Sequence, residues 1–203
     1  KKLIEAGYDK NKITVIPNSI DAPCSYTPTS GEYIAYIGRL SYEKGYDLLV
    51  EVARKHPEIK FCFAGAQREK NNTEIPKNVE FKGYLQKKEL SKFIQESRFI
   101  VIPSRCYEGF PMAILEAACH GKPAIAPNHG GFTEIIGQGE NAIGKLFEPS
   151  NTDDLDKQIA ELWNNQTLTE ELGEKAFKKL KKHYDSEVVY KQWETLFSKL
   201  KNS

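Results

Sequence analysis

Short apolar segments alternate with helix-like patterns through the middle of this chain, and that alternation limits the folds it can adopt. Apolar runs predict strands at residues 33–37, 60–64, 79–82, 98–102, 124–126 and 145–147. Helical patterns predict helices at about 43–55, 87–96, 112–120, 152–164, 168–182 and 186–200. Strands and helices in alternation are typical of a parallel sheet covered on both faces. The predicted fold class is therefore α/β, a Rossmann-like doubly wound parallel sheet.

The opening of the chain has a different character. Residues 2–6 predict the end of a helix and residues 13–16 predict a strand, whereas residues 21–31 are rich in Pro, Ser and Thr, as linkers are. The chain is thus expected to begin in the tail of one domain and to cross into another. Lys1 is not a starting methionine, which suggests a fragment.

Charge and cysteine content argue against several classes of protein. Lys and Arg total 29 against 28 for Asp and Glu, so nothing calls for a nucleic-acid groove. The four cysteines show neither the C-x-x-C spacing nor the paired histidines of a zinc site, and a reduced, cytoplasmic protein is expected. No apolar run is long enough to span a bilayer. Peripheral contact with the inner face of the cytoplasmic membrane, through basic stretches such as 178–182, is the alternative location.

One predicted helix combines an apolar composition with two acids near its start. Pro111 is expected at its first helical position and Gly121 just past its end, while Glu116 lies inside it and Glu108 in the preceding loop. Helix starts present unpaired N–H groups and positive potential, which bind anions. Two acids beside an anion site suggest a ligand with phosphates and hydroxyls, such as a nucleotide sugar. The structural alternative is that Glu116 forms a salt bridge to a nearby lysine or accepts backbone hydrogen bonds.

A second cluster follows the first strand. Gly38 and Arg39 end that strand, and Lys44 falls in the first turn of the next predicted helix, where the helix dipole opposes a cation. A diphosphate between the lysine and the helix end would remove this conflict, and the Arg39 fork could bind the same phosphates. The alternative is that Lys44 pairs with Glu43 or Asp47.

These segments together resemble glycosyltransferase family 4. The resemblance rests on residues 37–45 (Ile-Gly-Arg-Leu-Ser-Tyr-Glu-Lys-Gly), on Pro103-Ser104, and on residues 108–123, in which seven residues separate Glu108 from Glu116. Residues 15–21 are similar to the family's segment that enters the second domain, which usually has Gly where Ser19 stands. The resemblance implies a retaining, nucleotide-sugar-dependent enzyme of GT-B architecture, of which this chain is the C-terminal, donor-binding half.

The same resemblance divides the chain and suggests its partners. Residues 1–22 would be the tail of a missing N-terminal acceptor domain and the interdomain segment, residues 23–185 the nucleotide-sugar-binding domain, and residues 186–203 a crossover helix that packs on the missing domain. The sugar would pass from a UDP-sugar, or a GDP-sugar as second choice, to a glycan or lipid-linked acceptor. A non-catalytic nucleotide-sugar-binding module is the alternative.

Site residues follow from the resemblance position by position. Arg39 and Lys44 would hold the diphosphate and stabilise it as it leaves, and Glu108 would face the transferred sugar; these three are the expected catalytic residues. Glu116 would bind the ribose hydroxyls. The full expected donor site is Gly38, Arg39, Lys44, Gly83, Tyr84, Leu85, Glu108, Gly109, Phe110, Pro111, Met112, Ala113 and Glu116.

Main-chain groups complete this expected site. Chain around Gly83-Tyr84-Leu85 would recognise the base, and amides near residues 109–113 would contact sugar hydroxyls and phosphate. Pro111 has no N–H, so the available amides are those of Phe110, Met112 and Ala113. Arg39, Lys44 and the helix end would neutralise the diphosphate, so no metal and no other cofactor is expected.

Overall fold

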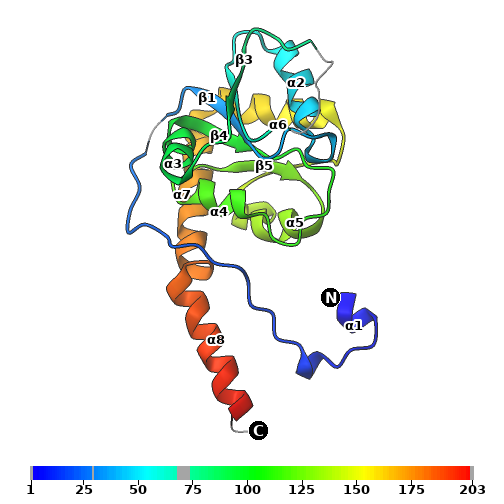
Figure 1. Ribbon diagram of the computed structural model, residues 1–203, viewed down its shortest axis with the longest axis vertical. Coiled ribbons are helices and arrows are strands. Elements are labelled where there is room, and N and C mark those ends of the chain that lie inside the picture. The colour runs from blue at the N-terminus through cyan, green and yellow to red at the C-terminus, as the bar shows by residue number, and fades with distance from the viewer. Residues whose placement is uncertain (1, 29, 68–73, 202–203) are drawn as a thin grey trace.

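The computed structural model describes residues 2–28, 30–67 and 74–201. A six-stranded sheet forms its centre, and every neighbouring pair of strands in it is parallel (Figure 1). The strands are β1 (Tyr33–Ile37), β2 (Phe61–Ala64), β3 (Val79–Gly83), β4 (Ser97–Val101), β5 (Ala124–Pro127) and β6 (Gly144–Phe147), arranged in the order β3-β2-β1-β4-β5-β6. This architecture confirms the predicted Rossmann-like fold class.

Helices cover both faces of the sheet. One face packs against α2 (Tyr46–Lys55) and α6 (Thr152–Asn164), and the other against α3 (Lys87–Glu96), α4 (Met112–Ala118), α5 (Gly130–Ile136) and the C-terminal half of α7 (Gln166–His183). The helices α1 (Lys2–Glu5) and α8 (Ser186–Lys201) lie at the two ends of the described chain. Doubly wound packing of this kind encloses the central strands on both sides.

The two cores follow directly from the period of two along each strand. In β1, Ile34 and Tyr36 join the core beneath α2 and α6, whereas Tyr33 and Ala35 join the core beneath α3, α4, α5 and α7. Successive side chains of a strand point to opposite faces, so an unbroken apolar run supplies both cores. This is why the short continuous runs of the sequence correctly predicted strands.

The order of the strands creates a crevice at one point of the sheet. After β1 the chain moves outward to β2 and β3, then returns to place β4 on the other side of β1. Connections on the two sides of this switch therefore leave the carboxyl ends of β1 and β4 in opposite directions. Ligands of open α/β sheets bind in the crevice formed there. The β1–α2 and β4–α4 loops border it, and both carry predicted site residues.

The strand predicted at the start of the chain is absent from the structure. Residues 13–16 form no strand, because no other strand of the described chain pairs with them and a lone extended segment is not stable as a strand. A helix that the sequence analysis did not predict, α5, forms at Gly130–Ile136. Its opening glycines, Gly130 and Gly131, are poor helix formers that hid it from pattern reasoning.

The last helix extends well beyond the sheet, and the N-terminal segment extends to the same side (Figure 1). The apolar side chains of this helix are well buried only at its start: Val189 is 3% exposed, whereas Trp193, Phe197 and Leu200 are 44%, 58% and 63% exposed. In the described parts of the chain, every helix lacks either the length or the apolar character needed to cross a bilayer.

Candidate functional site

The β1–α2 and β4–α4 loops meet through an ion pair between two predicted site residues. The Nζ of Lys44 lies 2.7 Å from Oε1 of Glu108, and the two side chains are 23% and 22% exposed. They are 64 residues apart in sequence. Lys44 therefore pairs with neither Glu43 nor Asp47, the local partners that the sequence left open. The pair places a cation and a carboxylate together at the switch point of the sheet.

The position of Lys44 differs from the prediction. It ends a short 3₁₀ turn, Tyr42–Lys44, and α2 begins only at Tyr46. Gly45 separates the two because it adopts a left-handed conformation, with φ 70°. A Cβ atom at Gly45 would lie 1.8 Å from the carbonyl oxygen of Pro103, so only glycine lets the two loops approach this closely. Lys44 thus lies before the helix. The prediction that it falls in the first turn of the helix is wrong.

Arg39 is the second predicted phosphate ligand, and it lies on the more exposed side of this loop. Its Nη2 is 2.6 Å from Oε1 of Glu43, and both side chains are nearly half exposed. The carbonyl of Arg39 accepts a hydrogen bond of 2.6 Å from the hydroxyl of Tyr36. Burial, with the nearby carboxylates of Asp47 and Glu108, raises the pKa of Tyr36 well above its ordinary value. Tyr36 therefore stays protonated and fixes the turn at Gly38-Arg39 as a donor.

Glu116 lies apart from the Lys44–Glu108 pair. It contributes to a hollow of about 460 Å³ between α3 and α4, together with Lys87, His120 and Asp21. Burial raises the pKa of the Glu116 carboxyl. Within the described ranges no hydrogen bond or ion pair reaches this side chain, so the alternative of a salt bridge to a lysine does not apply. A half-buried carboxylate of this kind can accept hydrogen bonds from a ligand's hydroxyls.

The entrance of α4 is braced by the unpredicted helix α5. The N–H of Gly131 donates to the carbonyl of Glu108 at 2.8 Å, and a Cβ atom at Gly131 would lie 2.3 Å from the carbonyl oxygen of Gly109. Pro111 directly precedes α4 as its N-cap instead of occupying the predicted first helical position. Phe110 packs edge-on against Tyr184, with ring centroids 5.6 Å apart. Met112 and Ala113 are partly buried against the core.

The segment predicted to recognise a base lies at the carboxyl end of β3. Gly83 ends the strand with φ 68°, Tyr84 is 77% exposed, and Leu85 is partly buried against the core. Gln86 then caps α3. Carboxyl ends of parallel strands share one edge of a sheet, so this segment lies on the same edge as the loops after β1 and β4.

Arg105 is a residue of this region that sequence reasoning missed. Its two guanidinium nitrogens each lie 2.7 Å from one carboxylate oxygen of Asp47, and Nη1 also donates to the carbonyl of Tyr42 at 2.6 Å. The guanidinium stacks 3.9 Å from the centre of the Tyr42 ring. Arg105 and Asp47 are 58 residues apart in sequence, so no local sequence pattern predicts their contact. Its place just after Pro103-Ser104 was the available signal.

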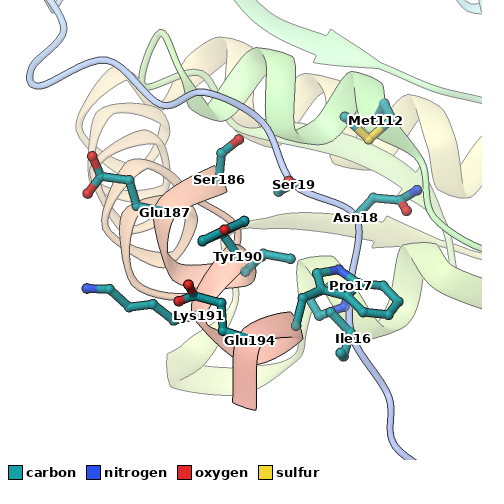
Figure 2. A pocket seen from close by; sticks show the side chains of 12 residues that line it. Ile16, Pro17, Asn18, Ser19, Met112, Ser186, Glu187, Tyr190, Lys191 and Glu194 are labelled. Atoms are coloured by element: carbon teal, nitrogen blue, oxygen red, sulfur yellow. The ribbon is translucent and has the colours of Figure 1, made fainter. Parts of the chain in front are cut away.

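A larger hollow, of about 970 Å³, lies between the N-terminal segment and α8. Figure 2 shows residues Ile16–Ser19 on one side and α8 with Tyr190 and Glu194 on the other, while Met112 of α4 borders the same space. Met112 is also a predicted donor-site residue. The hollow therefore reaches from the entrance of α4 to the exposed face of α8.

Comparisons with known proteins agree with this geometry. The chain matches the family described as glycosyl transferases group 1 over residues 25–179. An uncharacterised glycosyltransferase of Methanocaldococcus jannaschii is 33% identical over 173 residues, which cover 81% of this chain and 48% of that protein. The chain spans about half the length of the curated relatives it matches.

Solved structures show the same fold. HepE of Anabaena, crystallised in complex with UDP, superposes with a TM-score of 0.84 at 20% identity, over 97% of this chain and 60% of that one. The C-terminal domain of LpcC, a glycosyl transferase group 1 family protein of Francisella tularensis, superposes with a TM-score of 0.66 at 22% identity, over 77% of this chain and 88% of that one. The sheet therefore has the architecture of the C-terminal domain of GT-B glycosyltransferases. With the family match over most of its length, the chain belongs to the glycosyl transferases group 1.

Proposed function

We propose that this chain is the donor-binding domain of a retaining glycosyltransferase of the hexosyltransferase type. It binds a UDP-sugar, with GDP-sugars as second choice, and the complete enzyme transfers the sugar to a glycan or lipid-linked acceptor. The observation that carries the proposal is the Lys44–Glu108 pair at the switch point of a sheet that belongs to this family. A cation, a carboxylate and a helix entrance at this switch point support the proposal of a diphosphate-sugar site.

When the diphosphate binds, Lys44 and Arg39 exchange their carboxylate partners for phosphate oxygens. Lys44 and Arg39 each contact a carboxylate, Glu108 and Glu43 respectively. A donor diphosphate offers both cations stronger acceptors than a single carboxylate, and the Arg39 fork matches phosphate geometry. Lys44 then stabilises the charge that develops on the leaving diphosphate. Glu108, displaced from Lys44, faces the hydroxyls of the sugar.

The remaining contacts come from α4 and the end of β3. Amides of Phe110, Met112 and Ala113 at the α4 entrance donate to phosphate and sugar oxygens. The Glu116 carboxylate is half-buried and has no partner among the described residues, and it accepts hydrogen bonds from the ribose hydroxyls. Main chain at residues 83–85 recognises the base. Lys44, Arg39 and the helix entrance supply the positive charge, so the donor is expected to bind without a metal ion.

The identity of the base and the missing half of the enzyme rest on comparison. The HepE fold, 20% identical to this chain, was solved with UDP and also with UDP-glucose, which favours uridine. The chain spans about half of its curated relatives, so we assign the acceptor to a preceding domain that packs on α8 and Ile16–Ser19. We place the complete enzyme in the cytoplasm, with peripheral membrane contact as a further option.

A thermal-shift panel of UDP-, GDP-, ADP- and dTDP-sugars tests this proposal. Ligands that bind the folded state raise the melting temperature according to their concentration and affinity. We expect UDP-sugars to give the largest shift and Lys44→Met to reduce that shift strongly. A largest shift with GDP-sugars would change the base and keep the reaction class. The absence of any shift across the panel would refute the proposal.

A further inference from the structure

We infer that Arg105 is a positioning residue, which holds Lys44 and Glu108 in register across the crevice without touching the donor. The inference rests on the proposed function, because the register matters only if Lys44 binds a diphosphate. Arg105 lies on the β4–α4 loop, three residues before Glu108, and its contacts all go to the turn and helix that flank Lys44.

The contacts of Arg105 surround Lys44 on both sides in sequence. Its side chain donates to the carbonyl of Tyr42 and, in a two-point fork, to Asp47 in the first turn of α2. Its backbone N–H donates to the carbonyl of Glu43 at 2.9 Å. Arg105 thus connects the loop that carries Glu108 to residues on both sides of Lys44 in sequence.

The fork is committed to protein partners. The Arg105 and Asp47 side chains are 17% and 29% exposed, and both Nη atoms already bind Asp47 oxygens. The flat face of the guanidinium is covered by the Tyr42 ring. A direct contact with phosphate would cost these bonds, and two parallel charge-assisted bonds are among the strongest contacts of a protein surface. Arg105 therefore acts through Lys44 rather than on the ligand.

The geometry also demands arginine specifically. A lysine carries a point charge and can reach one oxygen of Asp47, but it cannot reproduce the planar two-point fork or the stacking on Tyr42. The alternative explanation is that Arg105 merely stabilises the fold. The two explanations make different predictions. If Arg105 positions Lys44, substitution of Arg105 lowers donor affinity only in a protein that still contains Lys44.

A double-mutant cycle on UDP affinity separates these roles. UDP binding by calorimetry and thermal unfolding are measured for the wild type, Arg105→Gln, Lys44→Met, the double variant and Arg105→Lys. Arg54→Gln is the matched control, since Arg54 is an exposed arginine of α2 that binds the carbonyl of Glu74. We expect Arg105→Gln to lower UDP affinity about tenfold in the wild-type background. In the Lys44→Met background the same substitution should lower UDP affinity less than about twofold. Arg105→Lys is expected to stay within about threefold of Arg105→Gln.

Each other result overturns the inference in an identifiable way. An equal loss in both backgrounds would mean that Arg105 acts on UDP directly or on the whole fold. A lower melting temperature with unchanged UDP affinity would leave Arg105 a purely structural role. A matching loss in Arg54→Gln would reduce the effect to net charge. A wild type that shows no saturable UDP binding would refute the proposed function itself, and this inference with it.

Discussion

Nζ of Lys44 and Oε1 of Glu108 lie 2.7 Å apart, so the predicted diphosphate ligand and the predicted sugar-facing acid are direct partners. Each offsets part of the cost of holding the other half-buried. A diphosphate that binds Lys44 must compete with Glu108 for it. Under the proposed function, donor binding is coupled to the release of Glu108, the acid proposed to meet the sugar, and variants of either residue should affect both steps.

The first prediction concerns Glu108→Gln. Removal of the competing charge frees Lys44, and a partly exposed ion pair is worth up to about 1 kcal/mol, so UDP should bind up to ~5-fold more tightly. Sugar transfer by the complete enzyme should fall by roughly 100-fold or more, because the lost contact strengthens in the transition state. Calorimetry and steady-state kinetics measure the two effects.

A distant carboxylate serves as the control for that variant. Glu58 is exposed and lies 3.4 Å from His56, outside the crevice. Glu58→Gln should alter neither UDP affinity nor turnover. A loss of UDP affinity in Glu108→Gln of more than tenfold would contradict the competition between Glu108 and phosphate.

The second prediction is that Glu116→Gln stabilises the folded protein and lowers its affinity for UDP. Burial raises the pKa of Glu116, so its charged form is unfavourable in the folded protein. The variant should melt at a higher temperature at pH 7.5, yet bind UDP about 10- to 100-fold more weakly, since a charge-assisted hydrogen bond is worth about 1.5–3 kcal/mol. Functional sites commonly trade stability for binding in this way.

The pH dependence of that stability difference gives an internal check. A raised folded pKa means that the contribution of protonated Glu116 is fully present below the unfolded pKa and is lost as pH rises through the folded pKa. The wild type should therefore approach the stability of Glu116→Gln as pH is lowered through this range. A difference that stays constant with pH, or a destabilised variant at pH 7.5, would show that Glu116 has a favourable structural partner.

The third prediction tests the contact between the two loops. Gly45→Ala and Gly83→Ala each place a side chain at positive φ, 70° and 68°. At Gly83 nothing lies within 4 Å of the new Cβ, so only strain of about 1–2 kcal/mol is expected. At Gly45 the Cβ also meets the Pro103 carbonyl at 1.8 Å, which should add about 1–3 kcal/mol. Denaturant unfolding measures both, and equal losses would contradict the close approach.

The sequence predicted the sheet well for a physical reason. Strands of a doubly wound sheet are buried on both faces, so runs such as residues 33–37 and 98–102 carry a strong local signal. The strand expected at residues 13–16 has the same local signal but no partner within the described chain, and pairing is a property that no local pattern reports. The start of α2 was misplaced because Gly45 is held by a contact with Pro103, far away in sequence.

The site was predictable only where a motif is local. Lys44 and Glu108 were each singled out from their own segments, but their pairing depends on the order of β1 and β4 in the sheet. Arg105 was missed because its contacts are with Tyr42 and Asp47, which are distant in sequence and pack against it only in the folded chain. The brace from α5 was missed because Gly131, which permits the contact with Gly109, also weakens the helical pattern.

The fourth prediction concerns the chain without a preceding domain. It should bind UDP but transfer little or no sugar, because donor and acceptor must be held together, and such positioning supplies on the order of 7–11 kcal/mol in well-oriented cases. Transfer should appear when the complete polypeptide is used. Robust transfer to an acceptor by the 203-residue chain alone would refute the division of labour proposed for this protein.

Lys44 and its loop are proposed to bind a nucleoside diphosphate. Calorimetry of UDP in EDTA, with the wild type, Lys44→Met and Lys157→Met, tests it most directly, since Lys157 is an exposed lysine of α6. We expect saturable binding by the wild type and by Lys157→Met, and binding about 10- to 100-fold weaker in Lys44→Met. Equal UDP affinity in all three proteins, or binding that requires a divalent metal, would contradict it.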